Sequence, residues 1–172
     1  AMIPNKKACD MSAAELAKYV DQSVLKPEFT QEEIRKYIKE GVDFGCATVC
    51  VNPASLDVAA ELTKGTDTKI CVVCDFGLST TASKVQQAEE YCKNWDIYEL
   101  DVVANYGWIR SGLYDEVTSD IKAVVDICHK YGTAVKVILE TDALTKEQIV
   151  KGTKCVVAAG ADFVKSSTGF YT

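Results

Sequence analysis

Histidine is almost missing from this chain: His129 is the only one among 172 residues. Zinc and related metals in proteins are held mainly by histidine and cysteine, so one histidine leaves few ways to build such a site. A single CxxC spacing occurs, Cys71 to Cys74, within the apolar run KICVVC. If that run is a strand, alternation points the two thiols to opposite faces. We therefore predict no metal site, and we place His129 on the surface at the carboxyl end of a helix.

Other features that are missing exclude further classes of protein. The net charge is -6 and no basic cluster occurs, so nucleic-acid binding has no electrostatic basis. No apolar run approaches the roughly 20 residues of a membrane span, and no signal-peptide pattern opens the chain. Neither GxGxxG nor GxxxxGK[ST] occurs, which leaves a nucleotide-binding fold without support. We expect a cytoplasmic protein that uses no cofactor.

Cysteine, in contrast, is plentiful. Eight cysteines are scattered through regular apolar segments, and we expect most of them to be small core residues of a reduced protein. Cys50 ends a predicted strand and has two interpretations. Its thiol either faces a pocket, where it would react with aldehydes, or is simply buried. The eight positions are Cys9, Cys46, Cys50, Cys71, Cys74, Cys92, Cys128 and Cys155.

Helix signals alternate with short apolar runs along the whole chain. Capping-box patterns begin helices at Ser12, Thr30 and Thr145, and Asn52-Pro53 has the pattern of an N-cap followed by a first-turn proline. Two more helices are predicted over 80–95 and 114–131. The strands are predicted at 19–25, 47–52, 68–74, 97–103, 134–140 and 162–167. With 48% hydrophobic residues and no linker, we expect one domain over 1–172.

Continuous apolar strands that alternate with helices indicate a parallel sheet, in either a barrel or a doubly wound arrangement. Nearly every predicted strand ends in polar residues, and in a barrel these would meet at one end. We therefore favour an α/β fold of the TIM-type (β/α)8 barrel. Only about six βα units are present, whereas such barrels typically take about 250 residues. We expect either a fragment that stops after the sixth strand, lacking strands 7 and 8, or completion by another chain. The polar strand ends are Asp21 with Ser23, Cys50 with Asn52, Asp75, Asp101, Glu140 and Lys165.

The segment ADFVKSSTG, residues 161–169, carries the strongest functional signal. It places Lys165 at the end of an apolar run that resembles a buried strand, directly before a turn rich in hydroxyls. A lysine in such a place is costly unless its charge is paired or lost. A desolvated, partly neutral amine is what Schiff-base chemistry on a carbonyl requires. Ser166 and Thr168 could hold the oxygens of a small polyol or phosphate. We predict that Lys165 is a nucleophile.

Two further charged residues are predicted inside the barrel. Glu99 and Asp101 share a strand face, and Asp101 either shuttles protons for a lysine amine or forms a structural ion pair. Lys136 shares a face with Glu140 on the next strand. It either favours the neutral amine of Lys165 by charge repulsion, or is held by Glu140 or Glu99 in a structural network. For Asp101 and for Lys136, both alternatives stay open.

The order of motifs resembles the deoxyribose-phosphate aldolase family. The resembling segments are VDQSVLKP (20–27), ATVCVNP (47–53), YELDVVANYGWIRSG (98–112), VKVILETDALT (135–145) and ADFVKSSTGF (161–170). The resemblance implies a (β/α)8 barrel and a class I aldolase. Such an enzyme cleaves 2-deoxy-D-ribose 5-phosphate to D-glyceraldehyde 3-phosphate and acetaldehyde through a lysine imine, in deoxyribonucleotide catabolism. It matches Lys165 to the Schiff-base lysine and Asp101 to the aspartate of the proton relay, and it leaves supporting roles for Lys136, Ser166, Thr168, Cys50 and Asp21.

The chain also departs from that family. Gln22 stands where the family usually has histidine, and CDFGLST (74–80) brings Asp75 and the flexible Gly77 into a turn that is normally stiff. The family's second relay lysine and phosphate loops would lie beyond residue 172. Two alternatives therefore stay beside the aldolase: another Schiff-base lyase with a different carbonyl substrate, or an inactive homologue. We expect a homodimer, because an unfinished barrel exposes apolar edges.

Overall fold

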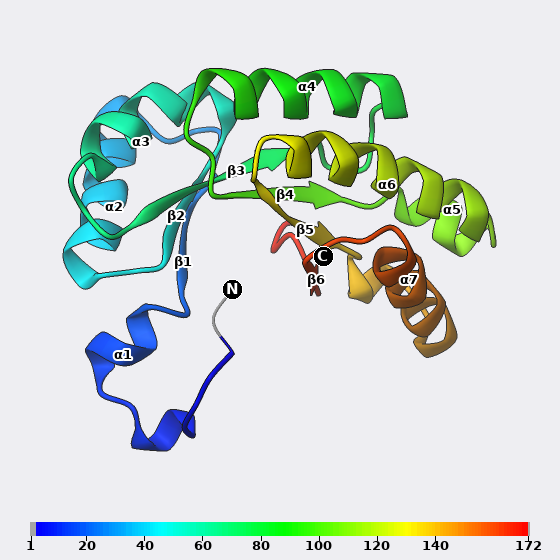
Figure 1. Ribbon diagram of the computed structural model, residues 1–172, viewed down its shortest axis with the longest axis horizontal. Helices are drawn as coiled ribbons and strands as arrows, with labels where there is room; N and C mark the ends of the chain where they lie inside the picture. Colours follow the sequence, from blue (N-terminus) through cyan, green and yellow to red (C-terminus); the bar gives the residue numbers. More distant parts are fainter. Residues whose placement is uncertain (1–2, 172) are drawn as a thin grey trace. The chain divides into compact units, whose positions relative to one another are not determined.

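The computed structural model describes residues 3–171; Ala1, Met2 and Thr172 lie outside them (Figure 1). The chain divides between Val72 and Val73 into two compact units, each of which has its own set of strands and helices.

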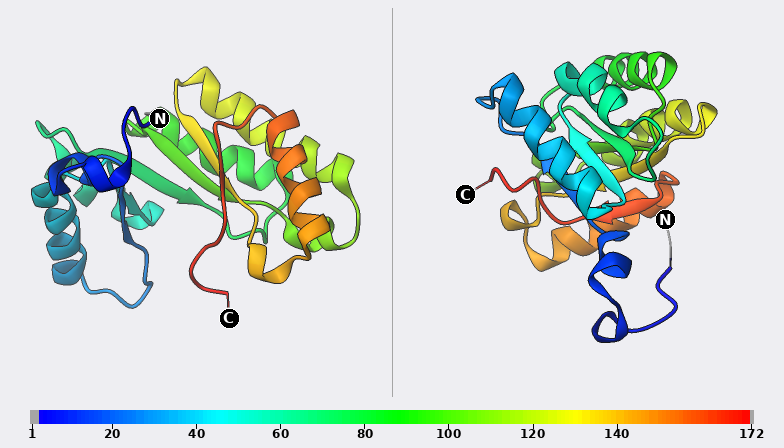
Figure 2. Two further views of the ribbon diagram at one scale, coloured as in Figure 1. Left: turned by 90° about the horizontal axis from the view of Figure 1, so that it is seen from below. Right: turned by 90° about the vertical axis from the view of Figure 1, so that its left-hand side faces the viewer.

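The first unit contains three neighbouring parallel strands in the order β1-β2-β3. Helix α2 packs on β1, β2 and α3, so it covers these strands (Figures 1 and 2). All four residues of β2 are buried, as expected for a strand covered on both faces. The elements are η1 (Ala8–Asp10), α1 (Ala13–Ala17), β1 (Asp21–Val24), α2 (Gln31–Phe44), β2 (Thr48–Val51), η2 (Pro53–Ser55), α3 (Leu56–Thr63) and β3 (Lys69–Cys74), whose last two residues belong to the second unit.

The second unit contains three neighbouring parallel strands in the order β4-β5-β6. Helix α6 packs against α4, α5, α7 and β5, and all five residues of β4 are buried (Figure 2). Consecutive order within each unit is the order of a barrel, since a doubly wound sheet reverses direction at a switch point. The elements are α4 (Thr81–Asn94), β4 (Glu99–Val103), α5 (Tyr106–Arg110), α6 (Tyr114–Lys130), β5 (Ala134–Ile138), η3 (Thr141–Ala143), α7 (Lys146–Ala158) and β6 (Phe163–Lys165).

The helix predictions are confirmed at all three capping boxes. At Ser12, Thr30 and Thr145 the hydroxyl accepts from the backbone N–H three residues later, and the side chain there accepts from the cap N–H. The prediction at Asn52 is confirmed in part. Asn52 is the N-cap residue and Pro53 the first residue of a short 3-10 turn that leads into α3. The Asn52 side chain makes no cap bond, because its amide donates to the Leu25 carbonyl at 2.9 Å and so joins the ends of β1 and β2.

The predicted strands occur in the right places but are too long. The segment predicted over 134–140 ends at Ile138, because Glu140 adopts a left-handed conformation with φ 57°. The segment predicted over 162–167 forms a strand only at Phe163–Lys165. It is also less buried than predicted, because Val164 is 49% exposed and its two neighbours are half-buried. The described residues contain no helix long and apolar enough to cross a membrane.

Candidate functional site

Lys165 and Asp101 meet within the second unit. The Lys165 Nζ lies 2.8 Å from Asp101 Oδ2, and the aspartate is almost fully buried whereas the lysine side chain is 32% exposed. The β4–β5–β6 register brings them together, since Asp101 pairs with Lys136 and Ile138 pairs with Lys165. A buried carboxylate is costly without a cation, and Lys165 supplies one. The amine is thus held on an acid while remaining within reach of a small molecule.

Lys136 is shared between two acids on the neighbouring strand. Its Nζ forms an ion pair with Glu99 and lies 3.7 Å from Asp101 Oδ1. It also lies 5.6 Å from the centre of the Phe163 ring, a cation–π distance. The structure therefore selects Glu99, and not Glu140, as the glutamate that holds Lys136. Asp101 contacts both lysines, so the four charged groups form one network.

The turn after β6 is tied to the end of β5. Glu140 accepts from the Thr168 backbone N–H at 3.2 Å and from the Thr168 hydroxyl at 2.6 Å. The Thr168 oxygen also accepts from the Phe170 N–H at 3.0 Å. The carbonyl of Ser166 accepts from Thr141 N–H at 2.9 Å. The Thr168 hydroxyl hydrogen is therefore committed to Glu140, and towards a ligand this oxygen can act only as an acceptor.

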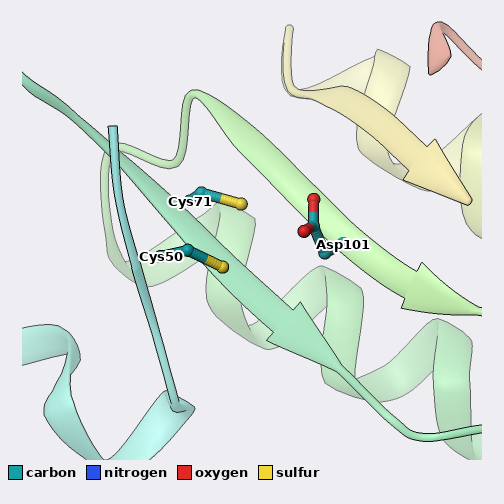
Figure 3. A group of neighbouring side chains, drawn as sticks. All are labelled: Cys50, Cys71 and Asp101. Atoms are coloured by element: carbon teal, nitrogen blue, oxygen red, sulfur yellow. The ribbon is translucent and has the colours of Figure 1, made fainter. Parts of the chain in front are cut away.

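Asp21 and Cys50 belong to the first unit. Thr48 on β2 donates its hydroxyl to Asp21 on β1 at 2.7 Å, so this partly buried carboxylate has a partner. Cys50 is fully buried and is paired in register with Cys71 on β3. Figure 3 shows the two thiols on the same side of these strands. Burial of Cys50 agrees with its interpretation as a small core residue.

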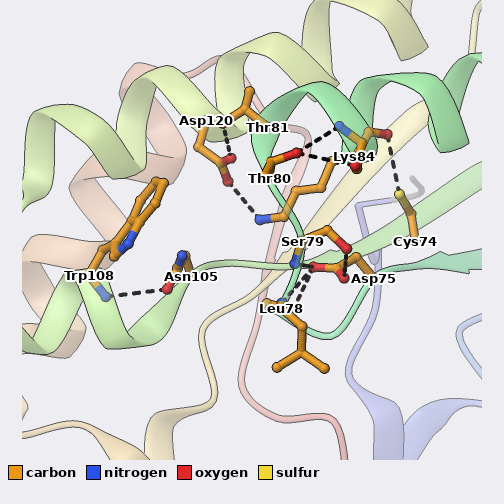
Figure 4. Close-up of polar contacts among 12 residues, drawn as sticks. Cys74, Asp75, Leu78, Ser79, Thr80, Thr81, Lys84, Asn105, Trp108 and Asp120 are labelled. Atoms are coloured by element: carbon orange, nitrogen blue, oxygen red, sulfur yellow. Dashed lines mark hydrogen bonds and ion pairs between the residues drawn. The ribbon is translucent and has the colours of Figure 1, made fainter.

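Asp75 directly follows β3, as predicted, and its carboxylate organises the turn there. One carboxylate oxygen accepts from the N–H groups of Gly77, Leu78 and Ser79, and the other accepts from the Ser79 hydroxyl at 2.7 Å (Figure 4). Burial alone would raise the pKa of Asp75, but the hydrogen bonds from Ser79 and Leu78 hold it below its usual range. Four hydrogen bonds to Asp75 thus hold the turn that contains Gly77.

A second buried ion pair was not predicted from the sequence. Lys84 on α4 lies 2.7 Å from Asp120 on α6, with both side chains almost fully buried, and Thr81 donates to the same carboxylate (Figure 4). Lys84 shares its buried helix face with Ala88, Tyr91 and Cys92. This spacing of four and seven residues was the available signal: a charged residue in the apolar stripe of a helix requires a buried partner.

His129 lies in the last turn of α6, as predicted, and is partly exposed. Its Nε2 lies 2.7 Å from Asp162 Oδ2, which also accepts from the Val135 N–H at 2.8 Å. Asp162 therefore joins α6, β5 and the start of β6. No local pattern predicts this link, because Asp162 lies 33 residues from His129 and 27 from Val135.

Comparison with known proteins matches residues 15–172 to a family described as DeoC/LacD family aldolase. The chain belongs to this aldolase family. A deoxyribose-phosphate aldolase from Streptococcus sanguinis is 46% identical over 158 residues, which are 91% of this chain and 71% of that protein. One from Aciduliprofundum boonei is 44% identical over 164 residues, 94% of this chain and 73% of that protein. The family consists of lyases, so the predicted enzyme class is confirmed.

Solved structures of this aldolase family confirm the predicted fold class, a TIM-type barrel of which six strands are present in the described residues. A putative deoxyribose-phosphate aldolase from Coccidioides immitis superimposes with a TM-score of 0.88 at 34% identity, covering 94% of this chain and 64% of that one. The aldolase from Aeropyrum pernix, a tetramer, gives 0.83 at 29% identity, over 94% and 68%. The chain thus spans about two thirds of the length of these structures. The homodimer expected from sequence stays a prediction.

Proposed function

We propose that this chain, as one aldolase-type barrel domain over 1–172, carries the imine chemistry that cleaves 2-deoxy-D-ribose 5-phosphate to D-glyceraldehyde 3-phosphate and acetaldehyde. One observation carries the proposal: a partly exposed lysine, Lys165, lies 2.8 Å from a buried carboxylate, Asp101. Amine and acid–base group are thus within hydrogen-bond reach of each other, which is the arrangement that nucleophilic amine catalysis requires.

The reaction follows from that pair. The neutral Lys165 amine adds to the substrate aldehyde carbon, and Asp101 relays the proton that leaves nitrogen and the proton that the departing water takes up. In the resulting iminium ion, the bond between C2 and C3 breaks as the C3 hydroxyl loses its proton, which releases glyceraldehyde 3-phosphate. The electron pair of that bond forms an enamine. Protonation at C2 and hydrolysis then free acetaldehyde and restore the amine.

Lys136 has a supporting role in this proposal. Its ion pair with Glu99 and its 3.7 Å approach to Asp101 keep positive charge beside the relay acid. The ion pair and this approach hold the two neighbouring carboxylates in place beside Lys165. Ser166, Thr168 and Asp21 are proposed as binding or supporting residues, and Thr168 as an acceptor only.

Trapping of the imine tests the proposal. The chain is incubated with acetaldehyde and borohydride, and its intact mass and peptides are measured. A reduced two-carbon adduct on Lys165, absent in Lys165→Arg and retained in Lys136→Met, is expected. An adduct confined to Lys136, or none at all, would contradict the assignment of the nucleophile. Release of acetaldehyde from the phosphosugar, in place of a keto acid, separates this reaction from that of another Schiff-base lyase.

A further inference from the structure

Glu140 combines two features that do not fit a passive residue. It follows β5 in a left-handed conformation, with φ 57° and ψ 64°, which is unfavourable for any side chain with a Cβ. Its side chain is also buried, with 2% of the residue exposed. Glycine would relieve the backbone, and an apolar residue would relieve the buried charge. The presence of glutamate therefore points to a use for its carboxylate.

Among the described residues, both carboxylate oxygens of Glu140 bind the same residue, Thr168. Oε1 accepts from the Thr168 N–H at 3.2 Å, and Oε2 accepts from its hydroxyl at 2.6 Å. Because both oxygens act as acceptors, the contacts suit the ionised form of Glu140. The same Thr168 oxygen accepts from Phe170 N–H. Glu140 therefore fixes the backbone and the side chain of the residue three positions after Lys165.

Among the described residues, backbone hydrogen bonds from the end of β5 reach the chain as far as Ser166. Leu139 N–H donates to the Lys165 carbonyl at 3.0 Å, and Thr141 N–H donates to the Ser166 carbonyl at 2.9 Å. Glu140 lies between Leu139 and Thr141 in the sequence, and its side chain binds the chain two residues beyond Ser166, at Thr168. The strand that carries Lys165 is short and half exposed, so the turn after it contributes much to how firmly the lysine is placed.

We infer that Glu140 is a positioning residue for the reaction of Lys165. It fixes the 166–169 turn, and through it the amine against Asp101 and the direction of the Thr168 hydroxyl. It acts through Thr168, to which both of its carboxylate oxygens are bound. The inference rests on the proposed function, since it concerns the rate at which Lys165 forms its imine.

The test compares four chains in the acetaldehyde and borohydride reaction: the parent, Glu140→Gln, Glu140→Gly and Glu147→Gln. Glutamine keeps the size of the side chain but cannot accept two hydrogen bonds through two oxygens. Glycine removes the carboxylate and also relieves the positive φ. Glu147 on α7 is the matched control, because its side chain is 75% exposed and is paired only with Lys151 in the same helix. Rate and final amount of Lys165 adduct are measured, with amide exchange of peptide 166–170.

We expect adduct formation about tenfold slower in both Glu140 variants, because loss of positioning lowers the reaction rate of every folded molecule. The final amount of adduct should be unchanged, exchange of peptide 166–170 faster, and Glu147→Gln like the parent. A variant that merely folds less well would give less adduct at the parental rate, which would overturn the inference.

Two other results would also decide whether the inference holds. A parental rate and parental exchange in Glu140→Gln would overturn the inference while the proposed function stands. Absence of a Lys165 adduct in the parent chain would overturn both. Combination with Thr168→Val adds a further check. If Glu140 acts through Thr168, the double variant is no slower than the slower single one, whereas multiplied effects would contradict that route.

Discussion

At the scale of single residues, the candidate site contains two carboxylates and two amines, whose charges compensate one another. Asp101 is the central member, because it contacts Lys165 at 2.8 Å and Lys136 at 3.7 Å. Glu99 forms an ion pair with Lys136. Equal numbers of opposite charges allow this set to be buried at moderate cost, whereas removal of one member leaves another uncompensated.

Asp101→Asn tests the role of the central acid. We expect the rate of reductive trapping at Lys165 to fall by about a hundredfold, since general acid–base assistance contributes a factor of this order. The change also removes one charge from the buried network, so the urea unfolding midpoint should fall as well, and the trapping rate is compared under conditions in which both chains are folded. Adduct formation at the parental rate would show that Asp101 only anchors Lys165. Asp115→Asn, an exposed change in the first turn of α6, is the control.

Glu140 shows at the same scale what sequence alone did not reveal. Its place at the end of an apolar run predicted an extended residue facing Lys136, since strands alternate. The conformation with φ 57° turns it instead towards Thr168. A contact between residues that are 28 positions apart, made from a disfavoured backbone conformation, leaves no periodic pattern to detect.

At the scale of elements, helices were predicted better than the contacts between them. A capping box is complete within four residues, so Thr30 with Glu33 and Thr145 with Gln148 could be recognised locally. The Asn52 amide instead bonds Leu25, which is 27 positions away. The pairing of α4 with α6 through Lys84 and Asp120 is equally non-local. Local chemistry is readable from sequence, whereas the partner of a buried polar group is not.

Lys84→Met is expected to destabilise the second unit by about 3 kcal/mol, because it leaves the Asp120 carboxylate buried without its cation. The free energy of unfolding in urea measures this. Replacement of both partners, Lys84→Met with Asp120→Leu, should recover most of the loss. A double variant that is much less stable than the single one would mean that the charges are needed for packing beyond their own pairing.

Asp162 gives the junction of α6, β5 and β6 a dependence on pH. Burial raises the pKa of Asp162, but bonds from His129 and Val135 N–H hold it below its usual range. A group with a lowered folded pKa adds stability above its unfolded pKa, about 4, and loses it as the pH falls through the folded value. Because this side chain is 38% exposed, we expect only about 0.5 kcal/mol.

Asp162→Asn should therefore lower the unfolding free energy slightly at pH 7 and have no effect near pH 2. Urea titrations at several pH values measure the difference between the two chains. A difference that stays constant over this range would exclude ionisation of Asp162 as its cause. Asp126→Asn, which changes an exposed pair within α6, provides the control.

At the scale of the whole molecule, the cysteines report on the integrity of the fold. Cys9 is exposed, and the other seven cysteines are buried. Burial raises the pKa of Cys74 to about 12, which keeps it a thiol at neutral pH. In the folded chain a hydrogen bond from Cys128 lowers the pKa of Cys92 below its ordinary value.

Treatment of the native chain with iodoacetamide at neutral pH should add one label, on Cys9, and eight in denaturant. Mass spectrometry of the intact chain counts the labels, and peptide analysis assigns them. Lys84→Met should speed labelling of Cys92 before that of Cys50, because Cys92 is on the helix that Lys84 anchors. Rapid native labelling of several cysteines would contradict the burial described above.

The turn after β3 also sets what sequence variation this molecule can tolerate. A Cβ on Gly77 would come within 2.8 Å of the Ala104 carbonyl oxygen, and the backbone there has φ 78°. The next residue, Leu78, is 86% exposed. A library that randomises both positions should thus return glycine at 77 in nearly every folded member and almost any residue at 78. Two adjacent codons would lie at opposite extremes of mutational freedom.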